Sequence, residues 1–416
     1  MKELKWSIEK ERKIIRGILI VLCIVLSMML KYNLSNNKEG ESLSQKELYE
    51  KGYDLPINEK DKRESEKECE KVMGIVYKIY ENSDKGNSIN ITIPEETVKQ
   101  MYDAIAAAGI PVSDSGNKYG MANHKKMEQF LNHSSSGIKS EIVVYRVLTN
   151  GGIARQKFIF DGKDMYSLYT NAVWNKNMLI SITATSYTRI KEWSYTEKGW
   201  FRFAYCVPEY PEVTEIMNGN MLIRVKPFNS KYQEMTEKYL VPVSYQGNNM
   251  LCSNWDEEHM EHLDYTGLFE SLYFIKYGDK LPFEQYSCGI PRDMFEDLMT
   301  EYLPVSREQL EEYAVYNKKN KVYEWDRLGC GNYSPNAFNF SYPEVTEIGN
   351  NADGTLTLTV DAVCEASDND DALTHKITVR LFQDGSIKYL SNQIAGDGLQ
   401  RIPAYQYRIS KIPGDS

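Results

Sequence analysis

The sequence is poor in the residues and motifs that carry most enzyme chemistry. Its 416 residues include only five histidines and seven cysteines. No two cysteines have the C-x-x-C spacing, so neither a redox pair nor a zinc knuckle is supported. The P-loop, G-x-S-x-G and G-x-G-x-x-G motifs are also missing, which removes the usual sequence grounds for predicting a nucleotide site or a serine hydrolase.

Basic residues are fewer than acidic ones. The chain has 49 Lys plus Arg against 59 Asp plus Glu, a net charge of -10. Because nucleic-acid phosphates would be repelled by this balance, we expect no nucleic-acid partner. The hydrophobic share of 42% and charged share of 26% are those of an ordinary globular protein, and the length suits two or three domains.

One long run without charge lies near the N-terminus, at residues 17–30, between Arg16 and Lys31. It predicts a membrane anchor over residues 17–31, at the short end for a spanning helix. The alternative is a cleaved signal peptide, which needs two small residues before its cleavage site, and the end of the run offers only Ser27. Six basic residues precede the run, so the positive-inside rule predicts a cytoplasmic tail over 1–16 and an extracellular remainder: a single-pass cell-membrane protein.

Residues 32–49 are polar and predict a flexible stalk. Beyond residue 31 the chain has 42 basic and 56 acidic residues, so anionic lipids or wall polymers would repel it unless a cation mediates. The six cysteines outside the uncharged run permit up to three disulfides.

A repeated sequence is the most informative feature. YPEVTEI occurs at Tyr210–Ile216 and again at Tyr342–Ile348, and weaker echoes occur in the same order, among them Ile93-Pro94 with Ile290-Pro291. These echoes predict two tandem related units, 50–228 and 229–416, with extra strands in the first. The alternative is coincidence, because Ile-Pro before an acid is simply a good helix start.

Each unit is predicted to contain helices followed by an antiparallel sheet, which makes the fold class α+β. Hydrophobic periodicity and turn residues place the elements. The predicted helices are 64–80, 92–108, 123–131, 265–277, 292–302 and 307–316. The predicted strands are 141–148, 154–160, 165–170, 178–186, 200–206, 322–325, 345–348, 355–363, 374–382 and 386–391.

The sharpest candidate site is the run Asp256-Glu257-Glu258-His259-Met260-Glu261-His262. On a helix its two histidines would share a face and could bind a metal with Asp256 or Glu258. The order does not match H-E-x-x-H, however, and an exposed acidic helix start explains the run better. A catalytic Cys–His pair elsewhere stays open, because its spacing in the sequence is unconstrained.

Three further motifs have ordinary explanations. Ser136–Lys139 matches S-x-x-K but lacks the later partners of an acyl-transfer site. Asn350–Gly354 lacks the acids of a calcium loop at the required positions and is predicted to be a hairpin turn. Ser367–Asp371 could hold a cation weakly, but an exposed loop is the preferred interpretation. The sequence therefore assigns no catalytic, cofactor-binding or metal residue.

Aromatic residues of the first unit form the remaining candidate, as an aromatic binding concavity. The residues in question are Tyr166, Tyr169, Trp174, Trp193 and Trp200. The alternative is that these rings fill the core of a larger sheet, as large aromatic residues generally do.

Several of these segments together carry a family resemblance. They are the basic-flanked anchor, the Ile-Pro helix starts, Thr196–Trp200, Tyr245–Asn249, Tyr342–Ile348 and Asp353–Leu358. In these segments the chain resembles an uncharacterised membrane-anchored family, a domain of unknown function in Gram-positive bacteria of clostridial type. The resemblance implies a Gram-positive outer surface and transfers no activity or site.

From these observations we expect a cell-envelope binding or scaffolding protein displayed outside the membrane. Its expected partners are the membrane, through the N-terminal helix, and an envelope protein or the cell wall. An envelope enzyme acting on cell wall or peptide, and an extracellular sensor subunit of a membrane complex, are the alternatives.

Overall fold

The computed structural model describes residues 44–86, 90–116, 120–329, 331 and 337–409. The chain divides into two compact units, Met1–Lys51 and Gly52–Ser416, which are described separately. In the described part of the chain, no helix combines the length and the apolar character that crossing a membrane requires. The predicted anchor at 17–31 lies outside the described residues.

In the first unit, helix α2 (Gln45–Lys51) occupies the end of the predicted flexible stalk. Ser44 and Glu47 cap its start reciprocally: the Glu47 carboxylate accepts from the Ser44 backbone N–H at 2.7 Å, and the Ser44 hydroxyl accepts from the Glu47 N–H at 3.3 Å. This capping box stabilises a helical turn at the end of the polar segment, and residues 32–43 of the predicted stalk lie outside the described residues.

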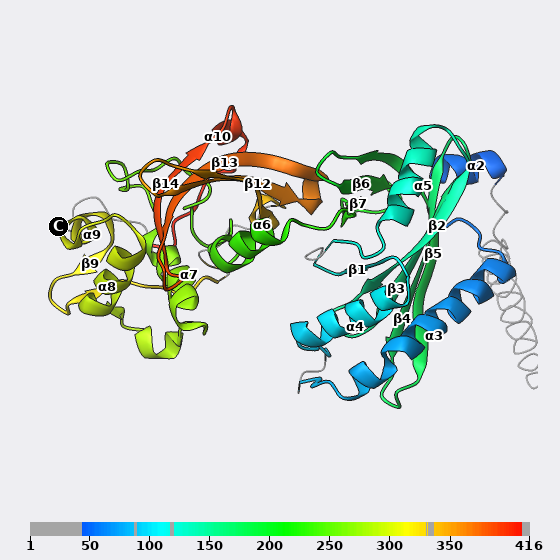
Figure 1. Cartoon of the computed structure of the whole chain (residues 1–416), viewed down its shortest axis with the longest axis horizontal. Helices are drawn as coiled ribbons and strands as arrows, with labels where there is room; N and C mark the ends of the chain where they lie inside the picture. The colour runs from blue at the N-terminus through cyan, green and yellow to red at the C-terminus, as the bar shows by residue number, and fades with distance from the viewer. Residues whose placement is uncertain (1–43, 87–89, 117–119, 330, 332–336, 410–416) are drawn as a thin grey trace, which may run out of the picture. The chain divides into compact units, whose positions relative to one another are not determined.

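The second unit begins with helices and a seven-stranded sheet (Figure 1). The strands follow one another in space in their chain order, and every neighbouring pair is antiparallel except β1 with β2, which is parallel. The helices are α3 (Glu59–Glu81), α4 (Glu95–Ala107) and α5 (Lys125–Ser135). The strands are β1 (Val112–Asp114), β2 (Ser140–Val147), β3 (Ile153–Phe160), β4 (Met165–Trp174), β5 (Ile180–Tyr195), β6 (Trp200–Tyr205) and β7 (Asn220–Arg224).

Helices α3 and α4 cover one face of this sheet. The apolar stripe of α3, which includes Val72, Val76 and Tyr80, is buried against strand residues. The Tyr80 ring stacks on the Trp174 ring with centroids 5.4 Å apart. The periodicity of α3 thus sets which face of the sheet it covers.

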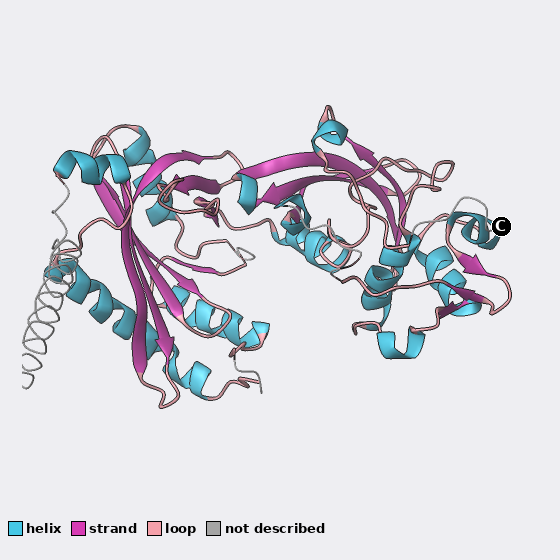
Figure 2. Cartoon of the chain, turned by 180° about the vertical axis from the view of Figure 1, so that it is seen from behind, coloured by secondary structure: helices cyan, strands magenta, loops and turns pink. Residues whose placement is uncertain are grey.

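The opposite face of the sheet curls around a second core. Helix α5 packs there against Phe158, Phe201 and Phe203. The two edges of the sheet are drawn together, since the Met121 N–H donates to the Val225 carbonyl (3.2 Å) just beyond β7, and Ala122 bridges to Val112 of β1. The strands of this curled sheet are drawn in magenta in Figure 2.

The C-terminal part holds a four-stranded antiparallel sheet, in the order β11-β12-β13-β14, and a small three-stranded sheet, β8-β10-β9. The strands of the larger sheet are β11 (Tyr342–Asn350), β12 (Leu356–Cys364), β13 (Asn369–Leu381) and β14 (Ile387–Ile394). Those of the smaller sheet are β8 (Ile290–Pro291), β9 (Tyr316–Asn317) and β10 (Val322–Tyr323).

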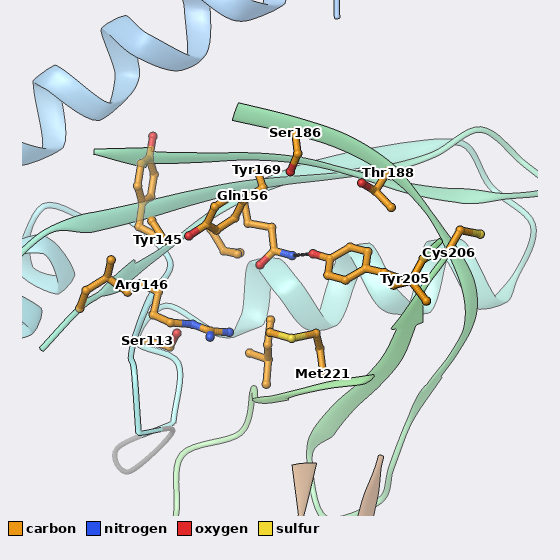
Figure 3. Close-up of a pocket in the computed structure, with 15 residues that line it drawn as sticks. Ser113, Tyr145, Arg146, Gln156, Tyr169, Ser186, Thr188, Tyr205, Cys206 and Met221 are labelled. Carbon is orange, nitrogen blue, oxygen red and sulfur yellow. Dashed lines mark hydrogen bonds between the residues drawn. The ribbon is translucent and has the colours of Figure 1, made fainter. Parts of the chain in front are cut away.

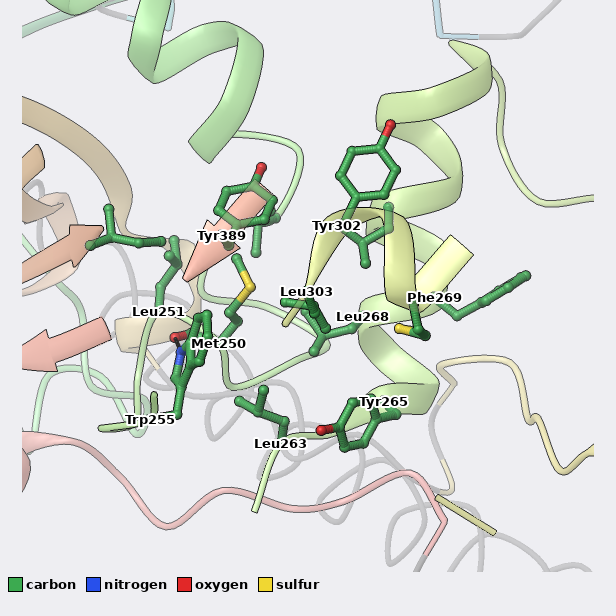
Figure 4. Packing of buried hydrophobic residues seen from close by; sticks show 14 of the residues in the cluster. Met250, Leu251, Trp255, Leu263, Tyr265, Leu268, Phe269, Tyr302, Leu303 and Tyr389 are labelled. Atoms are coloured by element: carbon green, nitrogen blue, oxygen red, sulfur yellow. Dashed lines mark hydrogen bonds between the residues drawn. The ribbon is translucent and has the colours of Figure 1, made fainter. Parts of the chain in front are cut away.

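Helices pack against these sheets and enclose a separate core (Figure 4). The helices are α6 (Ser230–Met235), η1 (Thr236–Leu240), α7 (Tyr265–Tyr277), η2 (Phe283–Tyr286), α8 (Arg292–Tyr302), α9 (Arg307–Tyr313), η3 (Ala337–Phe340), η4 (Glu365–Ser367) and α10 (Gly398–Arg401). The core they share with the larger sheet includes Leu268, Phe269, Leu303 and Tyr389.

The α+β class is confirmed, with helices and several antiparallel sheets. Both Ile-Pro helix starts are present, because α4 follows Pro94 and α8 follows Pro291. The two copies of YPEVTEI differ: Tyr342–Ile348 lies in β11, whereas residues 210–216 form turns and loop between β6 and β7. The first copy has no place beside β6, because β7 already pairs with that strand.

The described cysteines do not form the three disulfides that the sequence permits. Cys69, Cys206, Cys252 and Cys288 carry free thiols. Burial raises the pKa of Cys69 and of Cys252 to about 12, so both stay protonated at neutral pH. Cys330 lies outside the described residues.

Candidate functional site

A cavity of about 370 Å³ opens inside the curl of the seven-stranded sheet, which we call the sheet cavity (Figure 3). Its polar lining includes Ser113, Tyr145, Arg146, Gln156, Tyr169, Ser186, Thr188, Tyr205 and Cys206. Its apolar lining includes Val144, Leu148, Val207, Met221 and Ile223. This mixture of an apolar wall with a few converging polar groups is typical of small-molecule sites.

The strand register explains why these side chains meet. Gln156 of β3 is paired with Tyr169 of β4, which in turn is paired with Ser186 of β5. Residues directly opposite on paired strands point to the same face, so these three form one row across the sheet. Ser113 on β1 and Met221 on β7 close the cavity from the two curled edges.

A hydrogen-bond network fixes one side of the sheet cavity. The Gln156 amide nitrogen donates to the Tyr205 hydroxyl (2.5 Å) and to Ser167 Oγ (3.2 Å). Burial raises the pKa of Tyr205 to about 12, while Arg146 and the bond to Ser167 oppose that rise. Tyr205 is therefore a protonated hydroxyl at neutral pH, suited to hydrogen bonding rather than to accepting a proton as a base.

Among the described residues that line the sheet cavity, Arg146 is the one that carries a charge. Its terminal Nη2 atom is shielded from solvent and has no hydrogen-bond partner among the described residues. In Figure 3 the Arg146 guanidinium and the Tyr205 ring enter the cavity from opposite sides. A buried guanidinium nitrogen without a partner is costly, so a bound acceptor would stabilise this arrangement.

A second buried polar cluster surrounds His375. Its Nδ1 is 2.6 Å from Asn392 Oδ1, and its Nε2 is 3.0 Å from the Tyr245 hydroxyl. Burial lowers the pKa of His375 to about 4, so the ring is neutral, with Nδ1 donating and Nε2 accepting. Tyr245 occupies Nε2, and Cys252 keeps its proton, so His375 is not arranged to activate a described thiol.

The acidic run at 256–262 forms exposed turns instead of a helix. The Asp256 carboxylate accepts from the Glu258 backbone N–H (3.0 Å) and contacts His259 Nδ1 (2.9 Å). This local bonding competes with helix formation, and α7 begins only at Tyr265. His259 and His262 are exposed, and the described residues contain no group of three metal-ligand side chains. The bond to Asp256 raises the pKa of His259.

Ser136 and Asn350–Gly354 occupy the ends of regular elements. The Ser136 hydroxyl donates to the Asn132 carbonyl (2.9 Å) at the end of α5, so it is engaged by its own helix. Asn350–Gly354 joins β11 to β12, and Gly354 has the positive φ of +80° that the tight turn requires. The predicted hairpin turn is confirmed.

Ser367–Asp371 differs from the expected exposed loop. Asp370 is buried, and its Oδ2 lies 3.6 Å from Lys198 Nζ, while the Asp370 backbone carbonyl also accepts from that ammonium. Asp368 lies 3.5 Å from Arg202. The cations that these acids hold are therefore side chains of the same chain, because β13 begins within the segment and turns it toward β6.

The aromatic candidates divide between the core and the sheet cavity. Trp174 and Trp200 are buried, and their indole N–H groups donate to the Gly151 carbonyl and to Glu344 Oε2. Trp193 packs against Phe160 and Phe201. Tyr166 is half-buried beside Tyr187, and only Tyr169 lines the sheet cavity.

Arg146, Gln156 and Tyr205 were not among the residues that the sequence pattern indicated. One signal was present: Arg146 interrupts a strand whose other residues from Ile142 to Leu148 are apolar or aromatic. A lone charge in such a run indicates a polar site on the sheet face, but period-two alternation alone cannot separate that from solvent exposure.

A comparison with protein families gives a match over residues 62–408 to a family of unknown function, DUF6070. The chain belongs to this family. No curated protein and no solved structure matched the chain in the corresponding searches. Membership in DUF6070 therefore brings no known ligand, and the sheet cavity must be interpreted from its own chemistry.

Proposed function

We propose that this DUF6070 protein is a cell-envelope binding protein whose ligand occupies the sheet cavity. The observation that carries the proposal is Arg146 Nη2, which is buried at the cavity without a partner. Shielding that nitrogen from water without a hydrogen-bond partner costs the folded chain free energy. A ligand that accepts a hydrogen bond there would recover part of this cost, whereas a purely scaffolding role requires no such cavity.

The polar lining supports binding more than catalysis. Tyr205 stays protonated and hydrogen-bonded, and Gln156, Ser186 and Thr188 are neutral groups. Nucleophilic or acid–base catalysis needs a group poised to lose or gain a proton near neutral pH. The envelope-enzyme alternative would have to use other residues, and His259 and His262 lie on exposed turns.

The proposed location rests on the sequence. The uncharged run at 17–30, with six basic residues before it, supports a single-pass anchor with a cytoplasmic N-terminus. The sheet cavity would then face the outside, at a Gram-positive type of cell surface. If the protein is instead a sensor subunit of a membrane complex, its ligand would bind in the same cavity. Another chain would then carry the signal, because the tail 1–16 is too short to signal alone.

The tandem origin of 50–228 and 229–416 also stays a proposal. The Ile-Pro starts of α4 and α8 and the meandering sheets that follow support it. Superposing the two parts on α4 and α8 tests it: the strands after these helices should then follow the same path. Unrelated strand paths would contradict a duplication.

A ligand-capture experiment tests the proposed function. The full chain in detergent is incubated with a small-molecule extract of bacterial envelopes, washed, and analysed by native mass spectrometry. Ser186→Trp fills the sheet cavity, whereas Ala184→Trp adds the same bulk at an exposed position of the same strand. We expect a bound mass with the wild type and Ala184→Trp that Ser186→Trp loses. A mass that all three retain would contradict binding in the cavity.

A further inference from the structure

We infer that the sheet cavity takes a small organic monocarboxylate whose body is uncharged, with the carboxylate on Arg146. This inference deepens the proposed function and rests on it. It names the chemical class of the ligand, which neither the family nor the fold supplies.

The sign of the ligand charge follows from the lining. Among the described residues that line the cavity, Arg146 is the only charged one, and none of them is a carboxylate that could neutralise it. No ion pair or hydrogen bond of the Arg146 side chain is formed within the described residues, and its Nη2 is shielded from solvent. A guanidinium in this state pairs best with a planar carboxylate, which can accept two parallel N–H bonds.

The size of the ligand charge follows from the single positive charge that Arg146 contributes to the described lining. A doubly charged phosphate would bring two negative charges to one guanidinium, which leaves one charge uncompensated in a partly enclosed space. An amino acid with a free ammonium beside its carboxylate would need an acidic partner, and the described lining residues include none. One negative charge and no positive charge is therefore the best match.

The rest of the lining describes the body of the ligand. Gln156 donates through its amide nitrogen to Tyr205 and Ser167, which leaves its carbonyl oxygen available as an acceptor for a ligand N–H or hydroxyl. Val144, Met221 and Ile223 supply an apolar wall. A volume of about 370 Å³ is near the lower end for ligand pockets, which suits a small molecule.

Four matched probes test the class by ligand-observed NMR on the full chain in detergent. N-acetylglycine is a monocarboxylate with a neutral body, and N-acetylglycinamide replaces its charge by a neutral amide. Glycine adds the ammonium, and inorganic phosphate supplies the other anion. We expect N-acetylglycine to bind at least about tenfold more tightly than each of the other three, the size of a charge-assisted bond.

Variants of Arg146 test whether its guanidinium causes the preference for N-acetylglycine over N-acetylglycinamide. Arg146→Met should remove the preference of N-acetylglycine over its amide, and Arg146→Lys should retain part of it, because lysine keeps the charge but not the planar fork. Arg380→Met is the control, since Arg380 is a half-exposed arginine of β13. It should leave the preference unchanged. If Arg146→Met does not fold, by circular dichroism, Arg146→Lys carries the test, and a full preference in that variant counts against the paired geometry.

The outcomes separate this inference from the proposed function. Equal binding of N-acetylglycine and its amide, blocked by Ser186→Trp, would overturn the monocarboxylate while leaving a ligand in the cavity. Tightest binding of phosphate or of glycine would overturn it in the same way. If no probe binds, the molecule captured from the envelope extract tests the inference instead. A captured molecule without a carboxylate overturns the inference. Capture that Ser186→Trp does not change would instead defeat the proposed function.

Discussion

Arg224 of β7 and Glu344 of β11 form an ion pair that joins the seven-stranded sheet to the four-stranded sheet. Arg224 Nη1 lies 2.5 Å from Glu344 Oε2, and the two side chains are only 8% and 3% exposed. The same carboxylate oxygen accepts from the Trp200 indole N–H at 2.9 Å. Lys198 and Asp361 form a second link between the two sheets at 2.8 Å.

Removing the charge of Glu344 should therefore destabilise the fold. In Glu344→Gln the buried Arg224 guanidinium loses its counter-charge, and we expect the free energy of unfolding to fall by about 3 kcal/mol. Urea denaturation measures the loss. Glu347→Gln, on an exposed position of the same strand, should change it by less than about 0.5 kcal/mol. Equal stability of the two variants would show that the pair contributes little.

Stability should depend on pH through His375. Its pKa is about 4 in the folded chain, against 6.5 for an unburied histidine. The unfolded chain therefore binds a proton more readily than the folded chain between these two values. The contribution of His375 is complete above pH 6.5 and is lost as the pH falls toward 4, by about 3 kcal/mol at most.

Because other groups titrate in the same window, the variant His375→Gln isolates this effect. Chemical denaturation of both proteins at several pH values between 4 and 7 should show a flatter profile for the variant. Parallel profiles would mean that His375 does not account for the acid sensitivity.

Trp174 should be essential for the packing of α3 on the sheet. Its ring stacks on Tyr80 and is nearly fully buried, so Trp174→Ala should lower the free energy of unfolding by about 3–5 kcal/mol. Leu179→Ala, in the turn that follows β4 and 62% exposed, is the matched truncation and should have little effect. A thermal melt compares the two, and a mild loss for Trp174→Ala would restore it as a candidate surface residue.

The membrane topology can be tested with cysteine chemistry. Cys288 is exposed, so a maleimide that cannot cross membranes should label it in intact cells. In a background that also carries Cys206→Ser and Cys330→Ser, Cys288→Ser should remove that labelling, since the thiols of Cys69 and Cys252 have pKa values raised to about 12. Ser7→Cys, added in the Cys288→Ser background, should be labelled only after lysis. Labelling of Ser7→Cys in intact cells would reverse the proposed orientation.

Much of the local structure was predictable because its causes are local. Pro94 and Pro291 stand immediately before helices, where a proline leaves no backbone N–H without a partner, and the Ser306–Gln309 capping box starts α9. Gly354 marks its hairpin because only a residue that tolerates positive φ fits there. The turns at 256–262, where a helix start was expected, were not predictable, because the Asp256 side chain accepts a hydrogen bond within its own turn.

The candidate site was much harder to predict. Arg146 and Gln156 each appear in the sequence as one polar residue within a strand, and such residues usually face water. Only the curl of the sheet, closed between Met121 and Val225, turns that face into a cavity. The distance in sequence from Ser113 to Ile223 places this closure beyond any local pattern.

The sequence by itself determined the α+β class, the helix starts and the turns, because these depend on residues close together along the chain. Tertiary structure alone decided what the seven residues YPEVTEI become. The same letters form β11 where β12 offers a partner strand, and a loop where β7 already occupies the edge of β6. Tertiary structure also decided which acids are buried with arginine or lysine, as Asp370 and Glu344 are. Strand pairing and charge pairing join residues far apart in the chain, and their free energy depends on which partner the fold brings near.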